Sequence, residues 1–178
     1  MQMQENKSLL LKSAMEFGFG MGCYWVFKYL FFMFSLQVPL LSSLYWGLTI
    51  MVPYIAYRLT KRYRMQLGGQ IGFFHAWQFG ILLYFFAALI VSLVHYGFYR
   101  YIAPTDFLTN SINEAIGLLQ NSQIDNQLIQ SLQEIKITPI QMAIQGIFNN
   151  LFYGIIFSIP VAALLCRNNV SGQISDNR

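Results

Sequence analysis

Apolar residues gather in four long continuous runs, at residues 14–34, 38–57, 71–99 and 140–165. A helix that crosses the hydrocarbon core of a bilayer needs about 20 mostly apolar residues, because each residue rises about 1.5 Å and the core is about 30 Å thick. The runs reach that length and do not alternate with the two-residue period of a strand, which favours helices. The pattern therefore predicts an all-α fold, an integral membrane four-helix bundle.

The ends of two runs carry residues that typically begin helices. Pro39 stands where the second run starts, and the segment Thr138-Pro139-Ile140-Gln141 opens the fourth. In that segment the threonine suits the capping position, the proline suits the first helical position, and the glutamine lies three residues after the cap. The first run is followed by Leu36-Gln37-Val38-Pro39, which lacks the small residues of a cleavage site, so we expect a retained helix rather than a signal peptide.

A polar segment, residues 104–137, separates the third and fourth runs. Apolar residues recur in it at helical spacing, first at Phe107, Leu108, Ile112, Ala115, Ile116 and Leu119, then at Leu128, Ile129, Leu132 and Ile135. Residues 121–126 between the two sets indicate a turn. We therefore predict two short amphipathic helices outside the membrane, which cap the bundle or, as the alternative, offer a docking surface to a partner. Residues 1–170 then form a single transmembrane domain, with residues 104–137 as its extracytoplasmic insertion and residues 171–178 as a polar tail.

Lysine and arginine gather on one side of the predicted membrane. The loop after the second run carries Arg58, Lys61, Arg62 and Arg64 without an acid, the N-terminal segment adds Lys7 and Lys12, and Arg167 follows the last run. Positive residues in short loops stay in the cytosol, so both termini are predicted to be cytosolic. We interpret the 58–64 cluster as a topology anchor, with binding of anionic lipid headgroups as the alternative.

Composition supports a bilayer as the main partner of this chain. The sequence is 56% hydrophobic and only 10% charged, against roughly a quarter charged in an average soluble domain. The net charge of +4 comes from scattered residues rather than from one basic face, so nucleic-acid binding is not expected. Cys23 and Cys166 are isolated within apolar stretches, where we interpret them as packing residues rather than as a disulfide or metal ligands.

Small residues recur every four positions on the first and fourth predicted helices. The first carries Ala14, Gly18 and Gly22, and the fourth carries Gly146, Asn150, Gly154 and Ser158. Residues spaced by four share one face of a helix, and the lack of side-chain bulk lets two backbones approach closely. Our hypothesis is that these two helices pack against each other along the stripes, or that one stripe forms a homodimer.

A few ionisable and polar residues lie within the apolar runs. They are Glu16 and Lys28 on the first, His75 on the third, and Asn149 and Asn150 on the fourth. Each charged residue at a helix centre costs on the order of 3 kcal/mol on insertion scales, so such residues usually face a partner or water. By depth, Glu16 could pair with His75, and Lys28 with Asn149 or Asn150. We favour polar contacts that hold helices together, with Lys28 extending outward along its long stem, over a path for a proton or ion, because the aromatic second and third helices supply few polar groups at middle depth.

No arrangement of residues indicates catalysis or a cofactor. His75 and His95 lie on one helix about 30 Å apart by helical rise, so they cannot hold a haem between them in a monomer. No nucleophile with a neighbouring base and no phosphate-binding glycine loop is present in the sequence. We therefore expect no catalytic residues, no metal, no cofactor and no enzymatic activity.

Four features between Ala14 and Arg167 point to a family. They are the basic loop from Tyr57 to Arg64, the segment Ile71-Gly72-Phe73-Phe74-His75-Ala76-Trp77-Gln78-Phe79-Gly80, the sequence Tyr101-Ile102-Ala103-Pro104, and the polar helix before the last run. In these features the sequence resembles a family of four-helix membrane proteins of unknown function that is common in Bacteroidota. The likeness implies the inner membrane of a Gram-negative cell, and it carries no functional residues to this chain.

Two functions stay open at this point. The first, which we favour from the sequence, is a scaffold or interaction subunit that contacts another membrane protein or a second copy of itself. The second is a component of an oligomeric transporter or channel. A core filled with aromatic side chains would favour the first, whereas a water-accessible cavity that reaches Glu16 or Lys28 would favour the second.

Overall fold

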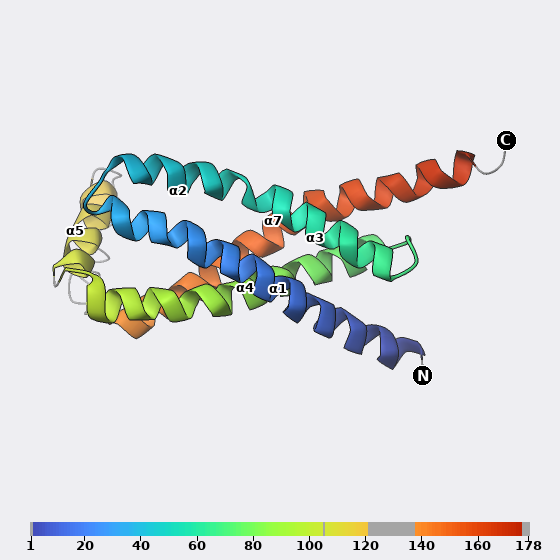
Figure 1. Cartoon of the computed structure of the whole chain (residues 1–178), viewed down its shortest axis with the longest axis horizontal. Helices are drawn as coiled ribbons and strands as arrows, with labels where there is room; N and C mark the ends of the chain where they lie inside the picture. The colour runs from blue at the N-terminus through green and yellow to red at the C-terminus, as the bar shows by residue number, and fades with distance from the viewer. Residues whose placement is uncertain (1, 105, 121–137, 176–178) are drawn as a thin grey trace.

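Four helical rods run back and forth along one axis (Figure 1). The computed structural model describes residues 2–104, 106–120 and 138–175. The first rod is α1 (Gln2–Ser35), the second is α2 (Leu40–Ile50) followed by α3 (Val52–Gln66), the third is α4 (Phe73–Gly97) with the π-helical turn η1 (Phe98–Ile102), and the fourth is α7 (Pro139–Ser175). A shorter helix, α5 (Phe107–Gln120), lies between the third and fourth rods. Among the described residues every regular element is helical, as the apolar runs predict.

Each rod is long and apolar enough to cross a membrane. The segments that meet this criterion are Lys7–Ser35, Leu40–Gln66, Phe73–Ile102 and Pro139–Arg167. Two helices extend beyond the apolar runs that predict them. The helix α1 already begins at Gln2, since its first turns contain neither glycine nor proline and are rich in residues that favour helices. The helix α7 continues to Ser175, so part of the predicted polar tail is helical.

The second rod is broken at Met51, a feature that the run at residues 38–57 does not predict. Pro53 has no backbone N–H, and its ring clashes with the carbonyl four residues earlier, so a regular helix cannot pass through it. The structure accordingly ends α2 at Ile50 and starts α3 at Val52. Tyr24 of α1 donates a hydrogen bond from its hydroxyl to the Leu48 carbonyl at 2.8 Å, which ties α1 to the end of α2.

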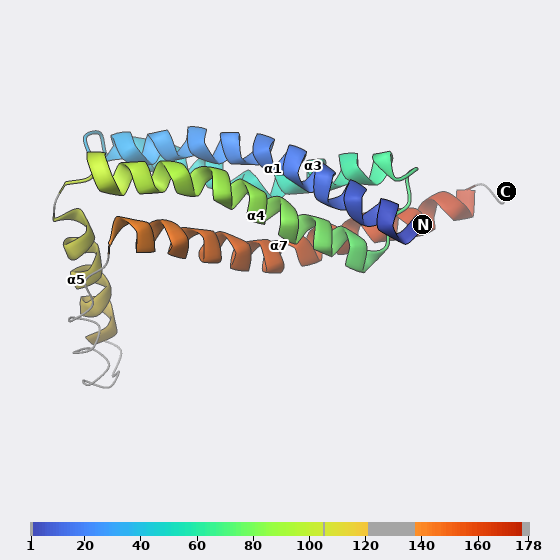
Figure 2. The ribbon, with the colours of Figure 1, turned by 90° about the horizontal axis from the view of Figure 1, so that it is seen from below.

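The helix α4 is the centre of the packing, with α1 and α7 as its main neighbours. Its buried side chains provide much of the core and are Ala76, Phe79, Leu83, Tyr84, Ala87, Ala88 and Val91. The helix α3 contacts α7 and α4, whereas α2 packs chiefly against α1. Figures 1 and 2 show α2 and α7 on different sides of α1 and α4. The two halves of the second rod therefore have different neighbours.

Glycines allow the close approach of α1 and α7 to α4. A Cβ atom added to Gly18 would lie 2.6 Å from the Phe86 Cβ, and one added to Gly154 would lie 2.5 Å from the Tyr84 Cβ. Gly22 meets Ile90 in the same way, at 2.7 Å. The two small-residue stripes therefore each face α4, and the predicted contact between the first and fourth helices along them is wrong. The reason is that α4 lies between α1 and α7 and is the main neighbour of both helices.

The end of the bundle that holds the α3–α4 turn is fixed by hydrogen bonds. Gly68 and Gly69 have positive φ angles of 83° and 88°, which glycine adopts without strain. Arg64 donates from Nε to the Gly69 carbonyl at 2.6 Å and from Nη1 to the Leu165 carbonyl at 3.2 Å, so it joins the turn to α7. Cys166 adds a contact from Sγ to the Ile71 carbonyl at 3.4 Å. The other cysteine, Cys23, is exposed, which corrects its prediction as a packing residue.

The helix α5 occupies the opposite end and runs across the direction of the rods (Figure 2). Phe107 at its start packs against the rings of Phe98 and Tyr99, with ring centroids 5.9 and 6.2 Å apart. The predicted turn at residues 121–126 and the predicted second amphipathic helix at residues 128–135 lie outside the described residues. The predicted cap of the last helix is confirmed, because Thr138 receives a hydrogen bond from the Gln141 backbone at 3.4 Å and its own N–H donates to the Gln141 side chain at 2.8 Å.

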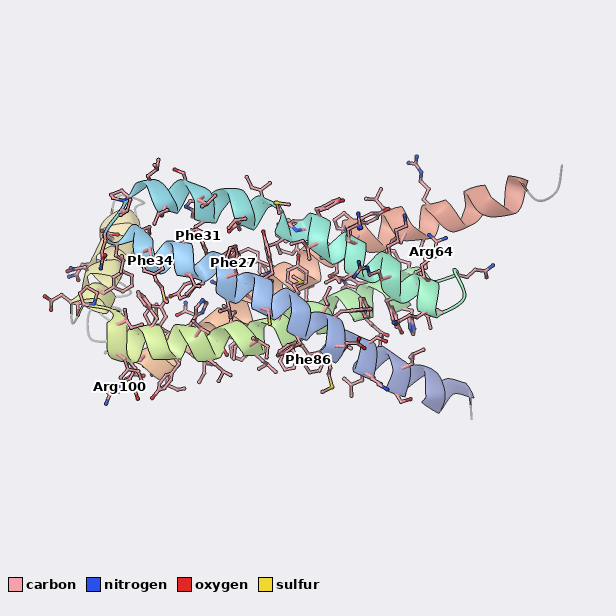
Figure 3. The ribbon with its side chains drawn as sticks, in the orientation of Figure 1. Phe27, Phe31, Phe34, Arg64, Phe86 and Arg100 are labelled. Atoms are coloured by element: carbon pink, nitrogen blue, oxygen red, sulfur yellow. The ribbon has the colours of Figure 1, made fainter. Side chains whose placement is uncertain are left out.

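Aromatic side chains also cover the outside of the rods. Figure 3 shows Phe27, Phe31 and Phe34 following one another along α1, with Arg64 and Arg100 at opposite ends of the bundle. Phe27 is 52% exposed and Phe34 is 57% exposed. Large apolar groups exposed in this way suit a helix surrounded by lipid rather than by water.

Candidate functional site

A cleft with polar groups in its walls lies between α1, the broken second rod, α4 and α7. Its volume is about 380 Å³, which falls in the range of sites for small molecules, roughly 300–1,000 Å³. It is lined by Trp25, Lys28, Tyr45, Trp46, Thr49, Val52, Pro53, Tyr84, Asn150, Tyr153 and Phe157. All four rods thus contribute to one cleft in the half of the bundle near α5.

Lys28 is the only charged residue among the described residues that line the cleft. It lies on α1, seven residues before Ser35 at the end of that span, which is about 10 Å by helical rise. Its Nζ donates a hydrogen bond to Thr49 Oγ1 on α2 at 3.1 Å. The ammonium also lies over the rings of Tyr45, at 5.1 Å, and Trp25, at 5.8 Å. The predicted pairing of Lys28 with Asn149 or Asn150 is therefore replaced by a contact with α2.

The charge of Lys28 is not neutralised by the walls of the cleft. An ammonium group has three N–H donors, and the structure assigns one of them to Thr49. Thr49 itself uses its hydroxyl proton to donate to the Tyr45 carbonyl at 2.8 Å, so its oxygen is oriented to accept from Lys28. Because no acidic side chain is among the described lining residues, two ammonium donors remain for another acceptor.

Three further donors near Lys28 are buried without a hydrogen-bond partner among the residues that the structure describes. They are Trp25 Nε1, Tyr84 OH and Tyr29 OH, and their side chains are 3%, 2% and 5% exposed. Trp25 and Tyr84 line the same cleft as Lys28. A buried polar group left unsatisfied costs about 1–3 kcal/mol, so these three groups lower the stability of the surrounding core.

A second cavity of about 330 Å³ adjoins the first and shares Tyr45, Asn150 and Tyr153 with it. Its other lining residues are Tyr29, Phe32, His95, Tyr99, Met142, Gln145, Gly146 and Asn149. His95 of α4 packs against Tyr29 with ring centroids 4.2 Å apart and the two ring planes tilted by 58°. A Cβ atom on Gly146 would lie 3.2 Å from His95 Nδ1, so this glycine of the predicted stripe makes room for the histidine.

The two asparagines of α7 have different positions. Asn150 lines both cavities, and its Nδ2 donates to the Gly146 carbonyl one turn earlier at 2.8 Å. This bond leaves the side-chain oxygen and one N–H of Asn150 for other partners. Asn149 is exposed and lines only the second cavity. Of the predicted intramembrane polar residues, Lys28, Asn149 and Asn150 therefore belong to one polar region.

Glu16 and His75, the other predicted pair, do not join that region or each other. His75 Nε2 lies 2.7 Å from the hydroxyl of Tyr63, whose ring stacks on the imidazole, and Glu16 is exposed. His75 also lines a separate cavity of about 270 Å³ beside the α3–α4 turn. On α4, the fully buried Phe79 and Leu83 come between His75 and the cleft. The two polar regions are separated by this apolar layer.

Within the predicted topology anchor, the four basic residues have different surroundings. Arg64 is half-buried and holds the turn, as described above, whereas Lys61 and Arg62 are exposed. Arg58 is also exposed and donates to the hydroxyl of Tyr54 at 3.2 Å. Only these three exposed residues of the cluster are available for anionic headgroups.

The remaining residues of the small-residue stripes are buried. Ser158, the last residue of the fourth-helix stripe, is buried beside Gly80 of α4, and Ala14 is fully buried on α1.

Sequence patterns missed His95, Tyr29, Thr49 and Tyr84 as members of the polar region. Depth was an available signal, because His95 lies seven residues before Ile102 at the end of its span, as Lys28 lies seven before Ser35. Among the described residues, no group of three or more histidine, cysteine, aspartate or glutamate side chains is placed to hold a metal ion. The site is defined by donors to an acceptor rather than by metal ligands.

Fold and site together define an all-helical protein with four helices long and apolar enough to cross a membrane and a polar cleft near one end. The chain belongs to a family described as a protein of unknown function (DUF4199), whose model matches residues 16–167. No curated protein and no solved structure matches the chain.

Proposed function

We propose that this protein is a multi-pass protein of the bacterial inner membrane that binds a small ligand in the cleft around Lys28. The sequence favours a scaffold or interaction subunit, with a transport component as the alternative. A cavity that reaches an intramembrane charged residue is the feature that favours the transport component over the scaffold. A cleft of about 380 Å³ at Lys28 therefore supports ligand binding, as a binding or transport component, over a scaffold.

The observation that carries the proposal is the surplus of hydrogen-bond donors in the cleft. Lys28 lines the cleft and has two ammonium donors left over after its bond to Thr49, and the side chains of Trp25 and Tyr84 line the cleft beside it. Side chains that only hold helices together satisfy one another, as Tyr63 and His75 do near the other end. Unsatisfied donors on a cation are the arrangement expected of a site for a ligand that brings acceptors.

The apolar layer below the cleft limits the kind of transport that this conformation supports. Phe79 and Leu83 are 0% exposed, and Tyr63 stacks on Phe79 with ring centroids 4.1 Å apart. A ligand at Lys28 is therefore reached from one half of the bundle and not through an open pore. We propose a binding step, which in a transporter would precede a conformational change or transfer to another copy or another membrane protein.

The charge distribution supports the proposed orientation, with both termini in the cytosol and α5 outside. The start of α1, the end of α7 and the α3–α4 turn lie at the same end of the rods (Figure 1). That end carries Lys7, Lys12, Arg58, Lys61, Arg62, Arg64 and Arg167, whereas the end with α5 carries Asp106 and Glu114 and, among the described basic residues, Arg100. Positive residues in short loops are retained in the cytosol. The cleft then opens in the outer half of the membrane.

Native mass spectrometry of the full-length protein, purified in a mild detergent, tests ligand binding. We expect a small molecule to remain bound to the wild-type protein and to be lost from Lys28→Met, which keeps the apolar stem but removes the charge. Lys12→Met is the matched control, because Lys12 is an exposed lysine on the same helix, and it should retain the ligand. Equal retention by Lys28→Met, or the absence of any bound molecule from the wild type, would contradict the proposal.

A further inference from the structure

We infer that the ligand is an anionic amphiphile, with a carboxylate or phosphate head at Lys28 and an apolar tail that leaves the bundle sideways between α2 and α7. The inference rests on the proposed ligand-binding function of this cleft and adds the chemical class of the ligand. Two independent observations support it, one on the head and one on the tail.

The chemistry of the deep part of the cleft selects an oxyanion. The Lys28 ammonium can only donate hydrogen bonds, and two of its N–H groups are left over after its bond to Thr49. No aspartate or glutamate is present among the described lining residues to neutralise the ammonium. A carboxylate or phosphate has several acceptor oxygens and a negative charge, and hydrogen bonds between ionised partners are about twice as strong as neutral ones. A neutral or cationic head would leave Lys28 without a counterion.

The shape of the cleft gives the tail a lateral exit. In this half of the bundle α2 packs chiefly on α1, while α7 packs on α4, and the contact between the second and fourth rods is made by α3 beyond the break. The rim of the cleft is formed by Trp46 of α2 and by Tyr153 and Phe157 of α7, which are 62%, 49% and 41% exposed. In a bundle that crosses a bilayer, these exposed aromatic rings face hydrocarbon. An apolar tail in contact with them would continue into the surrounding lipid.

The break in the second rod explains why the opening lies at the depth of Lys28. Thr49 accepts the hydrogen bond of Lys28. In a regular helix the Thr49 carbonyl would also accept a hydrogen bond from the backbone N–H of residue 53, but Pro53 has no N–H to donate. Both Thr49 and Pro53 line the cleft. One proline therefore places the helix break, the acceptor of Lys28 and the wall of the cleft at a single level.

The head chemistry alone could also suit a small soluble anion, and the exposed rim distinguishes the two sources. A free anion would gain nothing from Trp46 or Phe157, which contribute apolar surface away from the donors. An amphiphile uses both parts of the cleft and reaches it by diffusion within the membrane. We therefore assign the head to a membrane amphiphile rather than to a dissolved anion.

Binding to the full-length protein in phosphatidylcholine nanodiscs tests the inference. The probes are a long-chain fatty acid, its uncharged methyl ester, acetate and inorganic phosphate, with bound probe measured by mass spectrometry. We expect the fatty acid to bind, its methyl ester to bind at least about tenfold more weakly, and acetate and phosphate to show no binding at concentrations that saturate with the acid. Lys28→Met should lose at least about tenfold in affinity for the acid, while Lys28→Arg and Lys12→Met should retain it.

A second variant separates the tail from the head without affecting the core. Trp46→Ala removes an exposed rim residue, so we expect the protein to fold and to bind the fatty acid more weakly, with the same preference over its methyl ester. Equal binding of acid and methyl ester, or an unchanged affinity in Lys28→Met, would overturn the assignment of an anionic head. Tight binding of acetate or phosphate would overturn the amphiphile but leave ligand binding at Lys28 intact. If no probe binds while the purified protein still carries a Lys28-dependent molecule, the inference fails and the proposed function survives.

Discussion

At the scale of single residues, the environment of Lys28 is the feature that requires explanation. A charged residue at the centre of a span costs about 3 kcal/mol on insertion scales, and Lys28, about 10 Å from the end of its span, costs no more than that. Its hydrogen bond to Thr49 returns about 1.5–3 kcal/mol, in the range of bonds to charged groups. The two terms nearly cancel, so Lys28 contributes little to stability as a link between α1 and α2. Because these terms nearly cancel and two ammonium donors have no acceptor among the described residues, we attribute Lys28 to ligand binding rather than to a structural link.

The balance predicts opposite outcomes for the two partners of this hydrogen bond. Lys28→Met removes the buried charge together with its bond, and we expect the free energy of unfolding to change by less than about 1 kcal/mol. Thr49→Val keeps the charge and removes its only hydrogen-bond acceptor among the described residues, so we expect a loss of about 1–3 kcal/mol. Thermal unfolding of both variants in the same detergent measures the difference. A larger loss in Lys28→Met than in Thr49→Val would show that the lysine serves mainly to hold the helices together.

The residues of the cleft also show where sequence reasoning stops. The depth of Lys28 and Asn150 follows from run length alone, because helical rise converts position into height. Their partners do not follow, since a helix that is apolar all round gives no indication of which side faces a neighbour. Thr49 meets Lys28 because the break at Pro53 determines which side of α2 faces α1. The proline itself is visible in the sequence, and its clash with the preceding turn would have predicted that break.

At the scale of elements, α4 separates α1 from α7 and is contacted by glycines from both. Spacing by four correctly indicated that Gly18, Gly22 and Gly154 lie at helix contacts, but it could not identify the contacting helix. The partner is selected by side chains on α4, where Phe86 meets Gly18 of α1 and Tyr84 meets Gly154 of α7. Small residues thus predict close packing, whereas the order of helices depends on the whole set of contacts.

One helix provides both a sensitive position and a matched control for this packing. Gly22→Leu inserts a side chain where a Cβ atom would already lie 2.7 Å from Ile90, and we expect a loss of stability of about 1–3 kcal/mol or more from overpacking. Gly20→Leu on the same helix meets no atom within 4 Å and should leave the melting temperature unchanged in detergent. If Gly20→Leu is the more damaging change, Gly20 belongs to an interface outside the monomer, such as a contact with a second copy.

The turn between α3 and α4 offers another test of a local element. Arg64→Ala removes the bonds to the carbonyls of Gly69 and Leu165, and we expect the free energy of unfolding to fall by about 1.5–3 kcal/mol. Arg62→Ala, which changes an exposed basic residue of the same cluster, should stay within about 0.5 kcal/mol of the wild type. Equal effects of the two substitutions on chemical denaturation would mean that Arg64 acts only through its charge.

At the scale of the whole molecule, an even number of rods places the chain ends together, and charge decides which side of the membrane they face. Four apolar runs were sufficient to predict the rods, since length and hydropathy determine whether a helix can cross a bilayer. The cleft could not be predicted in this way, because it arises where α2 and α7 have different neighbours. Its position in the half opposite the basic residues follows only when the rods are assembled.

Labelling of single cysteines with a membrane-impermeant maleimide tests the orientation. In a Cys23→Ser, Cys166→Ala background, Asp106→Cys should react in cells whose outer membrane has been made permeable, and Lys7→Cys should react only after the inner membrane is also lysed. The physical reason is that positive residues in short loops are retained in the cytosol, which in the proposed orientation is the side of Lys7. The reverse pattern would invert the protein and place the cleft in the cytosolic half, and labelling of both positions in unlysed cells would contradict the four-span topology.

The central claim is that the cleft around Lys28 binds an acidic molecule, and an experimental structure of the wild-type protein in a lipid nanodisc tests it most directly. We predict density for a ligand whose head lies within hydrogen-bond distance of Lys28 Nζ, near the side chains of Trp25 and Tyr84. We also predict that its tail extends along Trp46 and Phe157, between α2 and α7. A cleft closed by contact of α2 with α7, with Lys28 directed out to the lipid surface, would contradict the account.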